Sequence, residues 1–309
     1  MIAFIFPGQG SQKVGMGRAF ADAFPVCRET MAEADAALGE DLSGLCFKGP
    51  EDRLVLTENT QPAILAVSVA IGRLLESKGV KADMMAGHSL GEYSANVMAG
   101  TIAFGDALTI VRRRGRYMQE AVPVGQGAMA AILGLDAAKV ADACAEAAQG
   151  DVVSAANINA PGQVVIAGSQ DAVARAIAQC KAHGARRAIP LAVSAPFHCA
   201  LMKPAEERLA PELRALAAAD PRVPIVANVD AELRRDAKSA IEALVSQVSS
   251  PVRWESVMQR LASEGIHKYV EVGPGTVLAG LGNKILKEAT FVSLEEPADL
   301  DAAVAALLS

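Results

Sequence analysis

The chain has 309 residues, of which 51% are hydrophobic, 21% charged and 4% aromatic, with a formal net charge of −6. This composition predicts a folded protein with a substantial core, in one large domain or two modest ones, and excludes a disordered chain. The acidic balance and the few aromatic rings argue against nucleic-acid binding. The five cysteines are scattered without a C-x-x-C pair, which indicates reduced thiols and a cytoplasmic location.

The first part of the chain alternates between strand-like and helical patterns. A buried strand at 2–6 precedes the loop Gly8-Gln9-Gly10-Ser11-Gln12, helical patterns at 16–24 and 26–38, and a long helix that Thr60 caps and Gly79 ends. A short strand at 81–86 precedes helices at 90–99 and 104–120. The longest apolar stretch, residues 63–72, is about half a membrane span, so we expect no membrane segment.

The middle third has a different order of elements. Strands at 126–133, 152–157, 163–167 and 185–191 alternate with helices at 137–148 and 171–183. This β-α-β-β-α-β order is the ferredoxin-like signature and predicts a small inserted domain at 125–196. The segments 1–124 and 197–309 would then form the large domain.

The last third again alternates between helices and short strands. Helices at 200–219, 237–248 and 254–264 and strands at 223–226, 268–272 and 291–294 precede a terminal helix. Strands separated by helices predict an α/β fold, with a mostly parallel sheet in the large domain.

The pentad Gly87-His88-Ser89-Leu90-Gly91 lies where the second strand meets its helix. It matches the G-x-S-x-G nucleophile elbow, which places a serine on a sharp strand-to-helix turn of an α/β-hydrolase-like sheet. A Cβ at either glycine would crowd this turn. Ser89 would lie at a helix N-terminus, where unpaired N–H groups favour a developing oxyanion. The alternative is a glycine-rich turn with Ser89 as an ordinary N-cap.

A serine nucleophile needs a base, and the chain has four histidines. His198 lies in the irregular segment Ser194-Ala195-Pro196-Phe197-His198-Cys199, at the predicted domain junction. Clefts form at such junctions, so we favour it as the base over a satisfied core histidine. No acidic third member of a triad stands out, and a backbone or amide carbonyl, with Gln247 one candidate, could hold the imidazole instead. We interpret Cys199 as structural.

Arg114 lies in a basic run late in the helix at 104–120. Most of such a run faces solvent, but one arginine turned inward could clamp a carboxylate through two parallel hydrogen bonds. The loop at 8–12 lacks the third glycine of a dinucleotide fingerprint, and the sequence has no P-loop or metal-ligand motif. We therefore expect no bound cofactor and no metal, and the N–H groups of this loop could instead face an oxyanion.

Eight segments in order resemble the malonyl-CoA:acyl carrier protein transacylases over nearly the whole chain. They are FPGQGSQ, TENTQPA, GHSLGEYSA, RRGRYMQEAVP, NINAPGQVVIAG, SAPFHCALMKPA, SSPVRW and EVGPGTVLAGL. The resemblance implies transfer of malonyl from malonyl-CoA to the phosphopantetheine thiol of acyl carrier protein, supplying fatty acid synthesis. Related acyltransferase domains occur in larger synthases, including those of polyketide synthesis, so the reaction class is firmer than the pathway.

The resemblance implies a serine–histidine mechanism. Ser89 would attack the thioester and carry the acyl group, and His198 would take the serine proton and return it to the leaving thiol. Gln247 matches the position whose carbonyl orients the histidine. The backbone N–H groups of Gln9 and Leu90 would form the oxyanion hole. A carrier thiol would then accept the acyl group, giving ping-pong kinetics.

The resemblance also assigns substrate-binding residues. Arg114 matches the arginine that binds the malonyl carboxylate, a group that is costly to bury unpaired. An acetyl group would leave the guanidinium unpaired, so the site should favour malonyl. The Phe197 ring, next to the catalytic histidine, could crowd an α-methyl branch. Asn157, Asn159 and Gln163 would line the cleft from the small domain.

The implied partners are malonyl-CoA, as substrate rather than fixed cofactor, and an acidic acyl carrier protein. A basic rim near the cleft should steer the carrier. The candidates for this rim are Lys181, Arg186, Arg187, Lys203, Lys284 and Lys287. Two other classes stay open: a serine hydrolase such as a thioesterase, with water as the acceptor, and a non-catalytic module that binds carrier or acyl-CoA.

Overall fold

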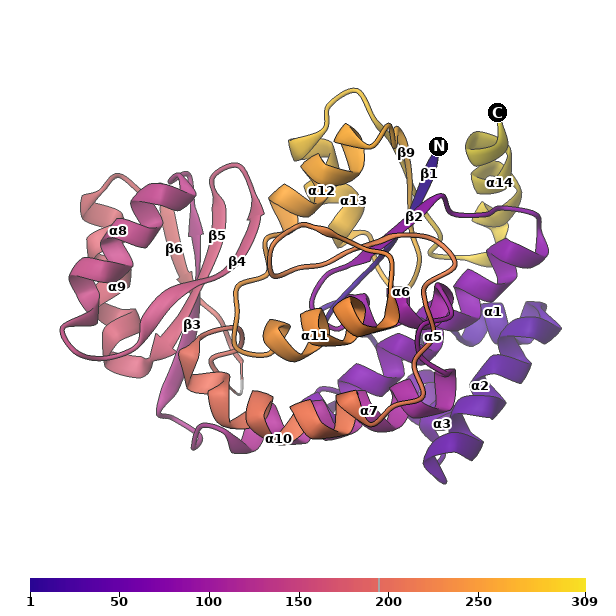
Figure 1. Cartoon of the computed structure of the whole chain (residues 1–309), viewed down its shortest axis with the longest axis horizontal. Helices are drawn as coiled ribbons and strands as arrows, with labels where there is room; N and C mark the ends of the chain where they lie inside the picture. The colour runs from indigo at the N-terminus through magenta and orange to yellow at the C-terminus, as the bar shows by residue number, and fades with distance from the viewer. Residues whose placement is uncertain (194) are drawn as a thin grey trace.

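A six-stranded sheet forms the centre of the computed structural model, which describes residues 1–193 and 195–309 (Figure 1). Its strands are β1 (Ile2–Phe6), β2 (Met84–Gly87), β7 (Ile225–Val226), β8 (Leu233–Arg234), β9 (Lys268–Glu271) and β10 (Thr290–Ser293). The order is β10-β9-β1-β2-β7-β8, and only β8 at the edge runs antiparallel to its neighbour. The predicted mostly parallel α/β sheet is therefore confirmed.

Helices cover both faces of this sheet because alternate residues of each strand point to opposite sides. Phe4 and Phe6 of β1 pack with α5 (Thr57–Ser77), α6 (Gly91–Met98) and α7 (Phe104–Glu120). Ala3 and Ile5 pack with α12 (Trp254–Ser263) and α13 (Val277–Ile285). The loops at the carboxyl ends of β1 and β2 thus emerge between the two layers of helices, where sites form in open α/β sheets.

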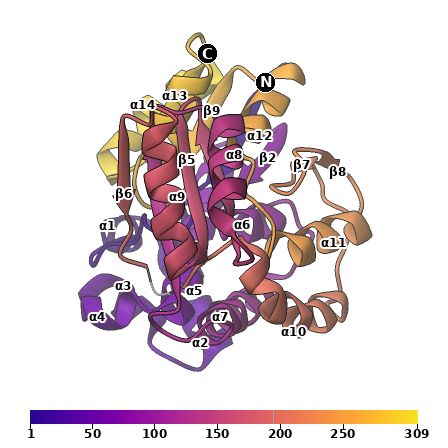
Figure 2. The ribbon, with the colours of Figure 1, turned by 90° about the vertical axis from the view of Figure 1, so that its left-hand side faces the viewer.

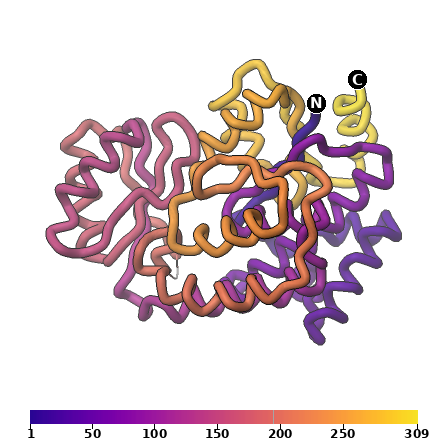
Figure 3. Tube along the Cα trace, viewed as in Figure 1, coloured from indigo at the N-terminus to yellow at the C-terminus, as the bar shows by residue number. Residues whose placement is uncertain are grey.

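The remaining helices complete the outer layers. They are α1 (Arg18–Ala23), α2 (Pro25–Leu38), α3 (Leu42–Lys48), α4 (Glu51–Leu54), α10 (Lys203–Arg214), α11 (Ala237–Gln247) and α14 (Leu300–Leu308), with short 3-10 turns at Ala200–Met202 and Pro297–Asp299. Both termini lie on the same side of the molecule (Figure 3). Within the described ranges, no helix is both long and apolar enough to cross a bilayer.

The second sheet has four antiparallel strands, with two helices on one face (Figure 2). The chain runs through β3 (Gly127–Leu133), α8 (Ala137–Ala148), β4 (Val153–Ala160), β5 (Gln163–Ser169), α9 (Gln170–Ala182) and β6 (Arg187–Pro190). The predicted β-α-β-β-α-β order is observed, and the strand order β4-β5-β3-β6 is that of a ferredoxin-like sheet.

Backbone hydrogen bonds tie the second sheet to the segment that precedes α12. Ile158 donates to the carbonyl of Val252, and Val252 donates to the carbonyl of Ala156, both at 2.9 Å. Asn157 forms an isolated parallel bridge with Val252 between them. This bridge fixes β4 against the segment that precedes α12.

Two predicted helix boundaries are wrong. The long helix begins at Thr57, and the Thr60 hydroxyl donates to the carbonyl of Leu54 at 2.6 Å instead of capping the helix. The helix predicted at 200–219 divides into the 3-10 turn and α10, which ends at Arg214. Ala219, predicted to be helical, instead donates to the carbonyl of Thr101 at 3.0 Å. The short elements α3, α4 and β8 were not predicted. Ser194, which opens the segment SAPFHCALMKPA, lies outside the described residues.

Candidate active site

The chain folds back on itself with very little space at Ser89. A Cβ on Gly87 would lie 1.9 Å from the carbonyl carbon of Gly91, and a Cβ on Gly91 would lie 2.0 Å from the carbonyl oxygen of Phe6. Only glycine fits at these two positions, as the sequence argument expected. Ser89 itself has a φ of 52°, a left-handed conformation that is uncommon for a non-glycine residue. This strained turn is the geometry of a nucleophile elbow.

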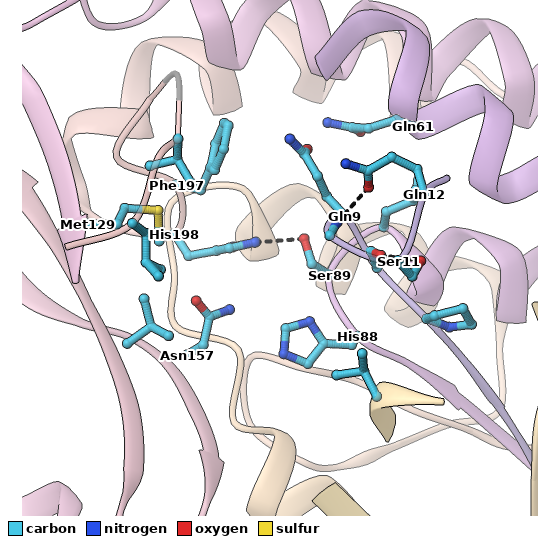
Figure 4. Close-up of a pocket in the computed structure, with 18 of the residues that line it drawn as sticks. Gln9, Ser11, Gln12, Gln61, His88, Ser89, Met129, Asn157, Phe197 and His198 are labelled. Atoms are coloured by element: carbon cyan, nitrogen blue, oxygen red, sulfur yellow. Dashed lines mark hydrogen bonds between the residues drawn. The ribbon is translucent and has the colours of Figure 1, made fainter. Parts of the chain in front are cut away.

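Ser89 and His198 lie within hydrogen-bond distance, although 109 residues separate them in the sequence (Figure 4). Ser89 Oγ is 2.6 Å from His198 Nε2, and His198 Nδ1 is 3.0 Å from the backbone oxygen of Gln247. A carbonyl can only accept, so Nδ1 carries the proton and Nε2 is free to accept the serine proton. This tautomer is the one a general base requires.

His198 is 4% exposed, and its surroundings favour the neutral imidazole. Burial lowers its pKa to about 3, helped by the positive charge of Arg114, while hydrogen bonds to the backbone partly oppose the shift. An uncharged base is therefore present across the physiological pH range.

Arg114 turns inward from α7 and is only 2% exposed. Its Nη2 donates to Ser89 Oγ at 3.2 Å and to Gln247 Oε1 at 2.8 Å, and its Nη1 donates to Gln61 Oε1 at 2.8 Å. The guanidinium also lies over the Tyr93 ring, 5.3 Å from its centroid. The cation thus stands beside the nucleophile in a polar cradle, where an acyl group with a free carboxylate could pair with it.

The Ser–His–Arg group opens into a cavity of about 600 Å³. Its walls come from both sheets: the loop after β1, the elbow, α5, α7 and α13 on one side, and β3, β4 and β5 on the other. Figure 4 shows Gln9, Ser11 and Gln12 of the first loop opposite Met129 and Asn157, with the Ser89–His198 pair between them. A mostly apolar cavity with a few polar groups that converge on one point is a favoured place for small-molecule binding.

The structure separates the predicted cleft residues into two groups. The first group lines the cavity and consists of Gln9, Leu90, Asn157, Asn159 and Phe197.

Two predicted residues lie elsewhere. Gln247 is fully buried behind the cavity wall and contacts it through Arg114 and His198. Gln163 is not among the described lining residues, and its Oε1 instead accepts a 3.0 Å bond from Lys284. The expectation that Gln163 lines the cleft is therefore wrong, because this residue lies at the turn end of the β4–β5 hairpin, opposite Ala160.

The loop after β1 approaches the elbow closely. A Cβ on Gly8 would lie 2.5 Å from the carbonyl oxygen of His88, so glycine is needed to bring this loop beside the nucleophile. Among backbone bonds within the described residues, neither Gln9 nor Leu90 has a carbonyl acceptor for its N–H. Two unpaired donors at a helix start and an adjacent loop are what an oxyanion requires.

Two other reactive side chains near the site have structural contacts. His88 Nε2 forms a 2.8 Å hydrogen bond with Asn159 Oδ1, so its ring is engaged away from Ser89. The Cys199 thiol is buried, donates to the carbonyl of Pro196 at 3.1 Å, and has its pKa raised to about 11 by burial. A thiol so rarely ionised is a poor nucleophile.

Sequence reasoning missed several residues that build the site. Gln61 accepts a hydrogen bond from Arg114, and Asn228 accepts one from the backbone N–H of Ser89 in the elbow. Glu92 accepts hydrogen bonds from Asn228 and Gln247. Gln61 lies in TENTQPA and Glu92 in GHSLGEYSA, so their segments were recognised but gave no individual role. Asn228 follows a two-residue strand and carried no signal. The apolar wall was missed too; it includes Met118, Met129, Val165, Leu278 and Leu281.

Comparisons with known proteins agree with this geometry. A family model described as acyl transferase domain matches residues 3–307. The malonyl CoA-acyl carrier protein transacylase of Escherichia coli is 54% identical over 303 residues, covering 98% of each chain. An acyl carrier protein S-malonyltransferase from Vibrio cholerae superposes with a TM-score of 0.96 at 50% identity, over 97% of this chain and 99% of that one. A malonyl-transacylase in complex with a type II PKS acyl-carrier protein gives a TM-score of 0.96 at 49% identity, over 99% of both chains.

An α/β sheet with an elbow serine, a neutral histidine and a buried arginine defines a serine acyl-transfer enzyme. The similarity covers almost the full length of this chain and of its relatives. The chain belongs to the acyl transferase family and, within it, to the malonyl-CoA:acyl carrier protein transacylases, which confirms the resemblance found in the sequence.

Proposed function

We infer that this protein transfers the malonyl group of malonyl-CoA to the phosphopantetheine thiol of acyl carrier protein, through a malonyl ester on Ser89. The observation that carries this inference is the position of Ser89 Oγ, 2.6 Å from His198 Nε2 and 3.2 Å from Arg114 Nη2. One oxygen thus contacts both a base and a cation that would pair with a carboxylate. The E. coli and V. cholerae relatives carry names of this same activity.

Acylation begins when Ser89 Oγ attacks the thioester carbonyl as its proton passes to His198 Nε2. The backbone N–H groups of Gln9 and Leu90 stabilise the oxyanion. The C–S bond then breaks, and the CoA sulfur takes the proton from His198. In the second half, the carrier thiol attacks the ester, His198 takes the thiol proton, and Ser89 Oγ regains it as the ester C–O bond breaks.

Arg114 selects the acyl group. Its guanidinium is already desolvated and positioned by Gln61 and Gln247, so a malonyl carboxylate meets a preorganised partner. An acetyl group offers that buried cation no carboxylate, which disfavours it.

The remaining cavity residues shape the space around the acyl group. The Phe197 ring faces the cavity beside His198 in Figure 4, where it would crowd an α-methyl branch and disfavour methylmalonyl. Asn157 and Asn159 supply amide groups from β4 on the opposite wall.

The low pKa of His198 predicts the pH dependence of acylation. A histidine with its pKa lowered to about 3 stays a competent base well below the ordinary midpoint of 6.5. We expect kcat/KM for Ser89 malonylation, measured by rapid quench, to vary by no more than about twofold between about pH 7.5 and about pH 5. Because the positive charge of Arg114 contributes to the shift, Arg114→Ala should raise the midpoint, measured with acetyl-CoA. A wild-type midpoint near 6.5 would contradict the burial argument.

Single-turnover labelling tests the proposed function. Brief exposure to malonyl-CoA should leave one malonyl group on Ser89, which then moves to carrier thiol faster than to water. Rapid release of free malonate would indicate a hydrolase, and the absence of any adduct would indicate a binding module. The hydrogen bonding of the base already differs from that of a typical hydrolase, since His198 Nδ1 bonds a backbone carbonyl rather than a carboxylate.

The carrier is proposed to dock on basic residues near one end of the second sheet. In the register of the second sheet, Gln163 of β5 and Arg187 of β6 both lie opposite Leu133 of β3. The Lys284 ammonium donates to Gln163 Oε1 and so lies at the same end. Arg186, next to Arg187 in the sequence, and Lys287, close to Lys284 in the sequence, are also exposed. Lys181 and Lys203 are exposed as well, but Lys203 is already paired with Glu206 at 2.5 Å, which favours the Arg187–Lys284 end.

We also propose that the chain forms two domains and that the protein is cytoplasmic. A small domain at 125–196 is supported by a hydrophobic core formed within the second sheet and its two helices, and the large domain would be 1–124 and 197–309. The five cysteines are free and buried, which fits a reducing cytoplasm.

A further inference from the structure

We propose that Glu92 is a positioning residue that joins the elbow to the Arg114 site through an elbow clamp formed by Glu92, Asn228 and Gln247. These three polar residues are almost completely buried and none of them contacts the cavity directly. The proposal rests on the proposed roles of Ser89, His198 and Arg114, and it explains what holds these side chains in their relative positions.

A single carboxylate oxygen forms the centre of the clamp. Glu92 is the second residue of α6 and is 1% exposed. Its Oε2 accepts a 2.7 Å bond from Gln247 Nε2 and a 3.0 Å bond from the backbone N–H of Asn228. The donors are 155 and 136 residues away in the sequence, so this oxygen links three distant segments at the base of the nucleophile helix.

The Asn228 arm holds the elbow. Asn228 Oδ1 accepts from the N–H of Ser89, and Asn228 Nδ2 donates to the carbonyl of Gly87, both at 2.7 Å. The side chain thus spans the turn on either side of His88. Ser89 adopts its left-handed conformation only at some cost, and these two bonds offset that cost in the place where the strain lies.

The Gln247 arm holds the cation and the base. Gln247 Nε2 also donates to the carbonyl of Ser89 at 2.9 Å, while its Oε1 accepts from Arg114 at 2.8 Å. The amide has only two N–H donors, and the acceptors Glu92 and Ser89 take both. Its oxygen must therefore face Arg114. The backbone oxygen of the same residue accepts from His198, so one residue sets both partners of the nucleophile.

Ordinary helix capping does not explain Glu92. A carboxylate in the first turn usually stabilises a helix by facing its free N–H groups. Here the Oε2 contacts come from Asn228 and Gln247, outside α6, and Leu90 at the N-cap has no side-chain cap. The geometry points instead to a tertiary role for this carboxylate, at the place where α6 packs beside α11 (Figure 1).

Two substitutions at Glu92 test the clamp. Glu92→Met keeps an unbranched side chain but removes the acceptor, so Gln247 becomes free to turn away from Arg114. We expect the ratio of malonyl to acetyl kcat/KM to fall by at least about tenfold, the size expected when a buried donor loses its acceptor. Glu92→Gln retains an acceptor oxygen and should keep the ratio within about threefold of wild type.

A purely structural role gives a different result. Loss of folded protein lowers both activities equally and leaves the ratio unchanged, so calorimetric Tm and active-site titration accompany each measurement. An unchanged ratio in folded Glu92→Met, or an equal loss in Glu92→Gln, would overturn the proposal. The control is Ser94→Ala on the same helix, which removes a buried hydroxyl without a hydrogen-bond partner among the described residues and should leave both activities intact.

A substitution at Asn228 keeps the proposal testable if Glu92→Met does not fold. Asn228→Ala releases the elbow but leaves Gln247 in place, so both acyl groups should be transferred at least about tenfold more slowly with an unchanged ratio. Wild-type rates in that variant would contradict the clamp. Wild-type enzyme that forms no malonyl–Ser89 would instead refute the proposed function, whereas a normal wild-type adduct with unaffected variants refutes only the clamp.

Discussion

Arg114→Ala is expected to lower malonyl transfer by about 10²–10³-fold while acetyl transfer is retained or increases. The malonyl carboxylate would enter the cavity without its cation, and a buried unpaired charge is strongly disfavoured. Acetyl does not carry that charge, and in the variant it no longer meets a buried cation that has no opposite charge beside it. Steady-state kcat/KM for malonyl-CoA and acetyl-CoA, with the same carrier protein, measures both changes.

Arg113→Ala is the matched control for this experiment. Arg113 is the preceding residue of the same helix, but it is half-exposed and its Nη1 donates to Glu212 at 2.8 Å on the surface. A paired charge at the surface contributes little, so both activities should stay near wild type. Normal malonyl transfer in Arg114→Ala would show that another group binds the carboxylate.

The contrast between these neighbours shows what periodicity can and cannot predict. The sequence identified a basic run on one helix, but the family resemblance, not the periodicity, singled out Arg114 as the inward arginine. The side chain of Arg112 in the same run is also mostly covered, with 13% of it exposed. The boundaries of α7 and α8 agree with the prediction because each helix has a clear amphipathic pattern. The start of α5 was misplaced because the hydroxyl of Thr60 bonds Leu54, a contact that no local pattern contains.

The site was only partly predictable for the same reason. Ser89 and His198 lie in segments whose composition is unusual in itself, an elbow and an irregular junction. Gln163 looked equivalent to Asn157 and Asn159 because all three are amides on one hairpin, but its position at the turn directs it to Lys284.

The sequence could not predict the buried polar residues that support the site. Glu92 lies in the first turn of a helix, where an acidic residue is ordinary. Its importance depends on Asn228 and Gln247 arriving from other segments, and that arrangement exists only in the folded chain.

Ser89→Ala is expected to abolish the covalent adduct and to lower transfer by about 10⁵-fold or more. Within residues 1–193 and 195–309, Ser89 Oγ is the hydroxyl at which both His198 Nε2 and Arg114 Nη2 are directed. Intact-protein mass measured after brief exposure to malonyl-CoA should show a malonyl group on the wild type and no added mass on the variant.

Cys199→Ala distinguishes the serine from the nearest competing nucleophile in the sequence. Cys199 follows the base directly and carries a thiol, the more nucleophilic group in general. Burial raises its pKa to about 11, however, and its Sγ is engaged with the carbonyl of Pro196, so almost no thiolate is present at neutral pH. The Cys199→Ala protein should therefore label to the wild-type extent at Ser89. If Ser89→Ala retained the label and the double variant lost it, the thiol would be the acyl carrier and the roles assigned to the elbow would have to be withdrawn.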